Sequence, residues 1–325
     1  MIISRTPLRV SLMGGGSDLP AFYRSEPGAV VSTTIDKYIY ITVNRAFDHN
    51  IRASYSRTEI VDHVDRVAHP LIREAMRQTG VTQGVEVTSI ADVPSRGTGL
   101  GSSSAYLVGL LNALWAYQGV HAPARRLARE ACHIELDVLG EPIGRQDQTI
   151  AAYGGLQLIR FNPDDSVFVT PVICRKETRA ALQQRLVLYY TGVTRSASEI
   201  LARQHEELPD RRGSVRRMVA MADEVFELLC ANGPLERLGQ LLHRSWELKR
   251  ELAPGVTIPE VDRLYDAARA AGALGGKLCG AGGGGFLLLF VEPEDQPRVH
   301  EALAELRAFP VRLEPEGSKI IYVEE

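Results

Sequence analysis

The sequence predicts an α+β protein of two domains, spanning residues 1–180 and 181–325. At 325 residues, the chain is long enough for two hydrophobic cores. Stretches with the alternation of β-strands are interspersed with stretches of helical periodicity. In the second half these stretches follow the order strand–helix–strand–strand–helix–strand, with extra helices in the first crossover. This order is the split βαβ arrangement of ferredoxin-like domains.

The individual elements follow from periodicity and from the turn residues between them. In the first half we expect strands at 1–12, 29–45, 84–90 and 154–161, and helices at 68–79, 102–118 and 124–139. In the second half we expect strands at 186–191, 276–279, 286–291 and 318–323, a helical block over 195–272 and a helix at 295–307. The polar stretch 162–166 predicts a turn, and the charged stretch 175–185 predicts the join between the domains.

Composition excludes several classes of protein. The formal charge of −3 favours neither nucleic acid nor an acidic membrane surface as a partner, although local basic residues leave a small anionic substrate possible. The four cysteines have no metal-binding spacing, so they predict free thiols in a reducing compartment. Arg5 and Arg9 interrupt what would be the apolar core of a signal peptide, and the run 286–291 is too short to span a bilayer. We therefore expect a soluble, cytoplasmic protein. The sequence leaves open whether it forms a homodimer.

The segment 94–104 (Pro-Ser-Arg-Gly-Thr-Gly-Leu-Gly-Ser-Ser-Ser) combines alternate glycines with the start of a helix. Glycine lets backbone N–H groups approach a ligand closely, and the amino end of a helix favours an anion. The apolar stripe that follows, from Leu107 to Trp115, is typical of a buried helix. The segment therefore predicts a phosphate-binding loop, and the alternative is a Gly/Ser loop that only caps the helix.

Two further glycine clusters lie at 14–18 and 280–285. The second matches G-x-G-x-x-G, but it opens a strand rather than a helix, so the dinucleotide interpretation fails. Lys277 is followed by Leu278 instead of Ser or Thr, which excludes a Walker A loop, and protein-kinase signatures are absent. If the chain uses ATP, it belongs to another kinase architecture.

Two carboxylates are candidates for chemistry. Glu135 lies on the apolar face of the helix predicted at 124–139, so it needs a strong partner. A Mg²⁺ ion and a neighbouring arginine are both compatible with that position. Asp147, within Gly-Arg-Gln-Asp-Gln at 144–148, could be a general base, although the residues alone favour an Asx turn.

Taken together, these segments resemble the three motifs of the GHMP kinases, in the same order. The first is Arg5–Asp18, the second Pro94–Ser104 and the third Gly276–Phe286. The resemblance implies an N-terminal domain like domain 2 of ribosomal protein S5 and a ferredoxin-like C-terminal domain. It also implies ATP and Mg²⁺ as cofactors and a small sugar phosphate as substrate.

Within the family, four phrases are similar to those of kinases acting on heptose 7-phosphate: 33–38, 143–148, 190–195 and 273–277. They imply phosphorylation of the anomeric C1 hydroxyl of D-glycero-D-manno-heptose 7-phosphate to the 1,7-bisphosphate, in nucleotide-activated heptose biosynthesis. The alternatives are another sugar 1-kinase of the family, of the fucose type, and a non-catalytic sugar or nucleotide sensor.

The resemblance also implies roles for individual residues. Asp147 would be the base or orienting group for the attacking hydroxyl, Arg9 the cation beside the transferring phosphoryl group, and Ser103 and Glu135 the magnesium ligands. The ATP phosphates would be bound by Pro94, Gly97, Gly99, Leu100, Gly101, Ser102, Ser103 and Ser104. The sugar phosphate would be bound by Gly15, Gly16, Asp18, Gly282 and Gly283, with Lys37, Arg145 and Arg195 as candidate partners of its 7-phosphate.

Overall fold

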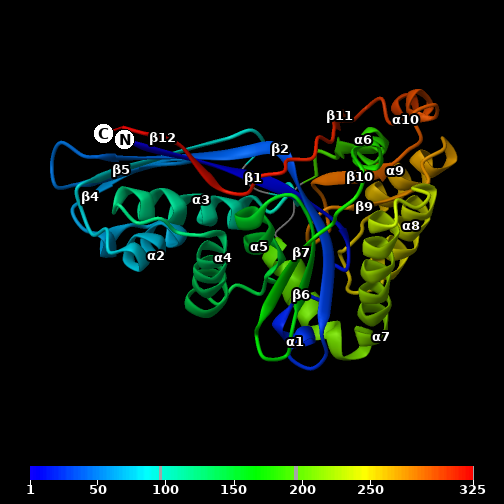
Figure 1. Cartoon of the computed structure of the whole chain (residues 1–325), viewed down its shortest axis with the longest axis horizontal. Helices are drawn as coiled ribbons and strands as arrows, with labels where there is room; N and C mark the ends of the chain where they lie inside the picture. The colour runs from blue at the N-terminus through cyan, green and yellow to red at the C-terminus, as the bar shows by residue number, and fades with distance from the viewer. Residues whose placement is uncertain (95–96, 194–196, 325) are drawn as a thin grey trace.

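The computed structural model describes residues 1–94, 97–193 and 197–324. Two β-sheets, each with its own helices, lie side by side along the longest axis of the molecule (Figure 1). The eight strands of the larger sheet are β1 (Ile2–Met13), β2 (Gly28–Arg45), β3 (Ile51–Ser54), β4 (Thr58–Val61), β5 (Val85–Ala91), β6 (Leu156–Phe161), β7 (Val167–Pro171) and β12 (Lys319–Val323). The four strands of the smaller sheet are β8 (Leu186–Tyr190), β9 (Gly275–Leu278), β10 (Phe286–Phe290) and β11 (Arg307–Pro310).

The hairpin of β1 and β2 is the spine of the larger sheet, whose main order is β12-β1-β2-β5-β3-β4. The 18-residue strand β2 changes neighbour along its length. Its first part pairs with β6 (Gly28↔Phe161) and its last part with β5 (Arg45↔Val85). The pairing of β3 with β5 is parallel, and the other pairings within this sheet are antiparallel.

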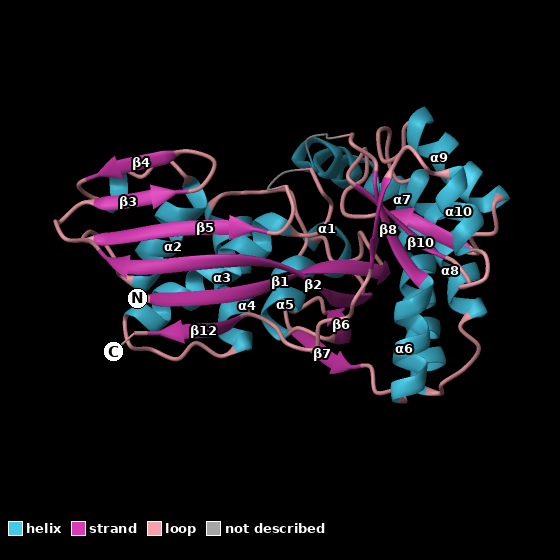
Figure 2. Ribbon diagram, turned by 90° about the horizontal axis from the view of Figure 1, so that it is seen from above, coloured by secondary structure: helices cyan, strands magenta, loops and turns pink. Residues whose placement is uncertain are grey.

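Helices cover one face of the larger sheet (Figure 2). They are α2 (Pro70–Thr79), α3 (Ser102–Tyr117), α4 (Ala124–Cys132) and α5 (Gln146–Tyr153), and the short α1 (Pro20–Tyr23) follows β1. Helix α3 is buried almost all round, because Gly109 lets it lie directly on β1: the Ser4 hydroxyl donates to the Gly109 carbonyl at 2.8 Å. This contact helps to place the amino end of α3 at the end of the larger sheet that lies next to the smaller sheet, where the candidate site is found.

The smaller sheet has the order β11-β8-β10-β9 and is antiparallel throughout. Its helices are α7 (Ala197–Cys230), α8 (Glu236–Arg250), α9 (Pro259–Ala270) and α10 (Gln296–Ala302). Leu287 and Leu289 face a separate core that contains the fully buried Trp246, whereas Phe286 and Leu288 face the core shared with the larger sheet. The α+β fold of two units is therefore confirmed.

Several expectations need correction. The strand expected at 318–323 exists as β12, but it pairs with β1 of the larger sheet (Ile2↔Val323), and β11 takes its expected place in the ferredoxin-like order. Residues 181–325 therefore do not all belong with the smaller sheet. The charged stretch at 175–185, predicted as the join between the domains, forms helix α6 (Lys176–Arg185) between β7 of the larger sheet and β8 of the smaller sheet. The helix expected at 124–139 ends as α4 at Cys132 and continues as a π-helical turn, His133–Val138.

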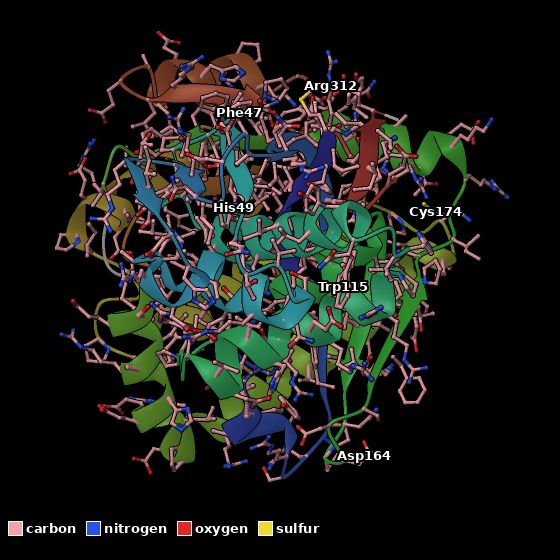
Figure 3. The ribbon with its side chains drawn as sticks, turned by 90° about the vertical axis from the view of Figure 1, so that its left-hand side faces the viewer. Phe47, His49, Trp115, Asp164, Cys174 and Arg312 are labelled. Carbon is pink, nitrogen blue, oxygen red and sulfur yellow. The ribbon has the colours of Figure 1, made fainter. Side chains whose placement is uncertain are left out.

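The turn predicted at 162–166 is present between β6 and β7. Asp165 adopts a positive φ of 62°, which Asp tolerates better than most residues. Asp164 lies at the periphery of the molecule, well away from Trp115 on the helical layer (Figure 3). The polar residues of this stretch thus form an exposed hairpin tip.

Candidate active site

The loop 97–101 leads into the amino end of α3 and has the conformation expected of a phosphate cradle. Gly97, Gly99 and Gly101 have φ values of 70°, 74° and 74°. The N–H groups of the first helical turn have no helical partner there, so they can donate to an anion. Leu100 is buried, and its carbonyl accepts the Arg9 N–H at 3.1 Å, which fixes the loop against β1. Pro94 is described and exposed, whereas residues 95–96 lie outside the described part of the chain.

Arg9 and Asp147 form a bidentate ion pair directly under this loop. The Arg9 Nε and Nη2 atoms each donate to an Asp147 carboxylate oxygen at 2.7 Å, and Nη1 donates to the Gly99 carbonyl. The Arg9 side chain is buried, whereas a quarter of the Asp147 side chain is exposed. Asp147 lies in the first turn of α5, so the Asx-turn interpretation is wrong. A carboxylate held at the edge of a phosphate loop can receive a proton from a substrate hydroxyl.

Glu135 is fully buried and is held by neutral donors. It accepts hydrogen bonds from Ser103 Oγ at 3.0 Å, from Ser104 Oγ at 2.7 Å and from Gln148 Nε2 at 2.6 Å. Burial raises the pKa of Glu135 to about 7, against the effect of these three donors. Among the described residues no arginine pairs with it, so of the two alternatives the arginine partner is not supported. A buried carboxylate without a cation beside a phosphate cradle fits Mg²⁺.

The loop 14–18 places Asp18 close enough to Asp147 for the two charges to interact. Asp18 accepts from the N–H groups of Gly16 at 3.2 Å and Gln146 at 3.3 Å. Burial, reinforced by the charge of Asp147, raises the pKa of Asp18. The α-carbon of Gly144 packs against this carboxylate so closely that a Cβ there would lie 1.9 Å from Oδ2. These contacts hold a carboxylate that can bind substrate hydroxyls.

The third glycine loop, residues 279–285, closes on the phosphate loop from the smaller sheet. The Phe286 N–H donates to the Thr98 carbonyl at 3.0 Å. A Cβ on Gly99 would lie 2.4 Å from the Cys279 carbonyl oxygen, and one on Gly285 would lie 2.5 Å from that of Thr98. Gly282 and Gly283 pack on Val256. The two units therefore meet through backbone against backbone at the candidate site.

Gly99→Ala should separate these two loops. The new Cβ would clash with the Cys279 carbonyl and would occupy a left-handed conformation, so we expect a loss of about 2–4 kcal/mol in the free energy of unfolding and weaker nucleotide binding. Thermal denaturation and calorimetric titration with ATP measure the two effects. Gly119→Ala is the matched control, because Gly119 has φ +72° but open space around its Cβ. Equal effects of the two substitutions would contradict the role given to the contact between the loops.

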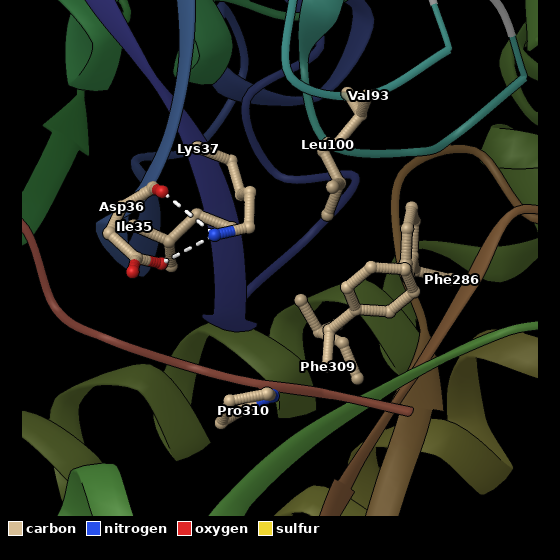
Figure 4. Close-up of a pocket in the computed structure, with 9 residues that line it drawn as sticks. Ile35, Asp36, Lys37, Val93, Leu100, Phe286, Phe309 and Pro310 are labelled. Carbon is tan, nitrogen blue, oxygen red and sulfur yellow. Dashed lines mark hydrogen bonds and ion pairs between the residues drawn. The ribbon is translucent and has the colours of Figure 1, made fainter. Parts of the chain in front are cut away.

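Of the three basic residues expected at a substrate phosphate, the structure describes Lys37 and Arg145. The Lys37 ammonium contacts Asp36 Oδ1 at 3.1 Å, beside a small cavity between the units (Figure 4). Arg145 pairs with Asp165 at 3.3 Å and stacks over Tyr23. Arg195 lies outside the described residues. Lys37 and Arg145 therefore have intramolecular partners of their own.

Sequence reasoning missed three side chains of this region. Gln148 completes the donor set of Glu135, and only its position next to Asp147 could have suggested it. Lys249 and Lys277 are both buried next to the third loop. A lysine within an apolar strand, between Gly276 and Leu278, was a signal that could have been used for Lys277.

Comparison with known proteins accounts for this arrangement. Residues 62–155 match the family model "GHMP kinases N terminal domain", and residues 225–308 match "GHMP kinases C terminal". The chain is 30% identical over 304 residues to the mevalonate kinase of Thermococcus sibiricus, covering 90% of this chain and 82% of that protein. This chain belongs to the GHMP kinase family. It is therefore a kinase, an enzyme that transfers a phosphoryl group.

Among GHMP kinases, two relatives are similar over nearly the whole length. The D-glycero-alpha-D-manno-heptose 7-phosphate kinase of Campylobacter jejuni is 29% identical, over 95% of this chain and 94% of the relative. A crystal structure described as a putative sugar kinase from Campylobacter jejuni is 26% identical with a TM-score of 0.74, covering 98% and 97% of the two chains.

The fold itself is shared more widely. The crystal structure of a D-glycero-D-manno-heptose 1-phosphate kinase from Bacteroides thetaiotaomicron has a TM-score of 0.83 at 24% identity, with both chains fully covered.

Within the described residues, no helix has the length and apolar character needed to cross a membrane.

Proposed function

We propose that this GHMP kinase transfers the γ-phosphoryl group of ATP to the anomeric C1 hydroxyl of D-glycero-D-manno-heptose 7-phosphate, forming the 1,7-bisphosphate. The observation that carries the proposal is the Arg9–Asp147 pair, held at 2.7 Å under the phosphate loop with Asp18 close by. The similarity to the Campylobacter jejuni heptose 7-phosphate kinase over 95% of the chain supports the choice of substrate.

In this proposal each residue of the site has a separate task. Asp147 accepts the proton of the C1 hydroxyl, which is more acidic than an ordinary alcohol and so needs only a weak base. Arg9 holds the Asp147 carboxylate in place and contributes positive charge beside the transferring group. Asp18 binds sugar hydroxyls, and the N–H groups at the start of α3 bind phosphate. Phosphoryl transfer depends mainly on such alignment and charge neutralisation.

Glu135 and Ser103 are the residues that would hold Mg²⁺. The magnesium ion would neutralise phosphate charge during transfer. Within the described part of the chain, no group of three or more His, Cys, Asp or Glu side chains is arranged to hold a metal. A single carboxylate with a hydroxyl fits Mg²⁺ bound jointly with nucleotide phosphates, since Mg²⁺ takes few protein ligands at such sites.

Two alternatives make different predictions. A fucose-type sugar 1-kinase would prefer an unphosphorylated sugar, and the chain is 25% identical to the bifunctional fucokinase/GDP-fucose pyrophosphorylase of Arabidopsis thaliana, although it covers only 31% of that protein. A non-catalytic sensor would bind sugar or nucleotide without turnover. The carboxylates Asp18, Glu135 and Asp147 favour catalysis, because a sensor needs no base beside the phosphate loop.

A substrate panel decides among these functions. ADP release should be measured with Mg·ATP and D-glycero-D-manno-heptose 7-phosphate, the unphosphorylated heptose or fucose. We expect kcat/KM to be highest for the heptose 7-phosphate, with the product phosphorylated at C1 by ³¹P NMR. A preference for either unphosphorylated sugar would contradict the proposal, and turnover of none would favour the sensor.

A further inference from the structure

Two buried lysines beside the third glycine loop have no task in the proposed mechanism. Lys277, on β9, is 2% exposed, and Lys249, on α8, is 5% exposed. The chain has only five lysines, so two of the five are buried at this one place. Lysine is rarely buried to this extent unless its charge has a partner.

Lys277 lies on the strand that leads into the site. It is two residues before Cys279, so the two side chains point to the same face of the strand. The Cys279 carbonyl lies against Gly99, and the Gly99 carbonyl accepts a hydrogen bond from Arg9. A continuous path of contacts therefore joins the strand of Lys277 to the Arg9–Asp147 pair.

Lys249 approaches the same place from the helix side. Its ammonium donates to the carbonyls of Leu278, at 3.4 Å, and Gly280, which flank Cys279. Leu252, three residues later, is the nearest side chain to Gly16 in the loop that carries Asp18. Lys249 thus lies between the first and third glycine loops.

Among the described residues, neither lysine has an anionic partner in an ion pair. No carboxylate of the described residues forms an ion pair with either ammonium, and Lys277 makes no hydrogen bond to a described residue. Burial lowers the pKa of Lys277 to about 8, and burial together with the charge of Lys277 lowers that of Lys249 to about 7. Leaving a cation buried without an anion is unfavourable, so the arrangement is one that an anionic ligand would stabilise.

We propose that Lys277 and Lys249 form a phosphate-binding subsite between the first and third glycine loops. The inference rests on the proposed function, in which both substrates carry phosphate. The phosphate would be the one that the sugar brings or the one that ATP transfers. Both are anions of the same chemistry, and a lysine ammonium binds either as a point charge. Lys37 and Arg145 contact Asp36 and Asp165, so among the basic residues that the structure describes the buried lysines are the better partners.

Lys277→Met tests the subsite, because methionine fills similar space without charge. kcat/KM should be measured for heptose 7-phosphate and for the unphosphorylated heptose, together with the calorimetric Kd for Mg·ATP. We expect kcat/KM for heptose 7-phosphate to fall about 10- to 100-fold, as loss of a charge-assisted contact predicts. A fall confined to the phosphorylated sugar assigns the phosphate to the sugar. An equal fall in kcat for both sugars, at unchanged KM, assigns it to the transferred group.

The melting temperature distinguishes a binding role from a structural one. We expect Lys277→Met without ligands to melt no lower than the parent protein, because an apolar side chain replaces an unpaired buried charge. Lys176→Met, at an exposed position of α6, is the control and should change neither activity nor melting. Unchanged kinetics, a large drop in melting temperature or failure of Lys277→Met to fold would each overturn the proposal.

The phosphate subsite can be tested even if the proposed function fails. If the parent protein phosphorylates neither heptose, the proposed function fails, and the subsite is then judged by calorimetric binding of heptose 7-phosphate and of Mg·ATP. An equal Kd for both ligands in the parent and in Lys277→Met would overturn the subsite without any use of turnover.

Discussion

Asp147→Ala should reduce kcat by at least about 10³-fold while the enzyme still binds Mg·ATP. The substitution removes the carboxylate that would accept the hydroxyl proton and leaves the phosphate loop and α3 intact. Coupled ADP release measures the first effect and calorimetric titration the second.

The folding of Asp147→Ala must be checked, because Arg9 is buried and would lose its bidentate partner. Asp147→Asn keeps the shape and one acceptor oxygen for Arg9, so it should fold normally and still lose most of its activity. Asp165→Ala, which removes a partner of Arg145 away from the phosphate loop, is the matched control. Near-normal turnover by Asp147→Asn would remove Asp147 from proton transfer and leave it a role in positioning Arg9.

Glu135→Gln should have the second largest effect, through the metal. The amide can still accept from Ser103 and donate to neighbouring oxygens, but it lacks the charge that attracts a divalent cation. We expect at least about a 100-fold fall in kcat/KM at 1 mM Mg²⁺, with partial recovery as the Mg²⁺ concentration rises. Initial rates across a magnesium titration measure both.

A nearby carboxylate provides the control for this experiment. Glu130 is also buried, but it accepts from Trp115 Nε1 at 2.6 Å and from Arg126 Nε at 2.8 Å. Glu130→Gln should therefore lower the melting temperature and leave the magnesium dependence unchanged. If Glu130→Gln and Glu135→Gln shift the magnesium dependence equally, Glu135 is not a metal ligand.

The parts of this fold that sequence predicts well are those where local pattern and tertiary environment agree. Helix α3 follows three glycines and is apolar over most of its length, so both its start and its burial could be predicted. Strand β12 could not be assigned to a sheet, because Lys319–Val323 has the same alternation whether it pairs with β8 or with β1. Strand pairing depends on contacts far apart in sequence, and periodicity carries no information about them.

In the candidate site, too, local pattern predicts some residues, whereas others depend on contacts between distant parts of the chain. Burial of Glu135 followed from the apolar face of its helix, and the structure bears it out. From the sequence alone, a catalytic role of Asp147 could not be distinguished from a role in a turn, because its partner Arg9 is 138 residues away in the chain. Lys249 and Lys277 are brought together by the packing of α8 on β9. Lys277 lies in the third glycine motif, but the local pattern around Lys249 does not indicate a site.

The return of β12 to the larger sheet has a consequence for how the protein is made. Strand β12 pairs with β1, and the Glu324 N–H donates to the Met1 carbonyl at 2.9 Å. During synthesis on the ribosome, β1 emerges long before β12, so this edge of the sheet stays uncovered until residues 319–323 have been made. Until then an exposed strand edge is available to other nascent chains. The larger unit cannot complete its sheet alone, so its folding ends only when the smaller unit has been made.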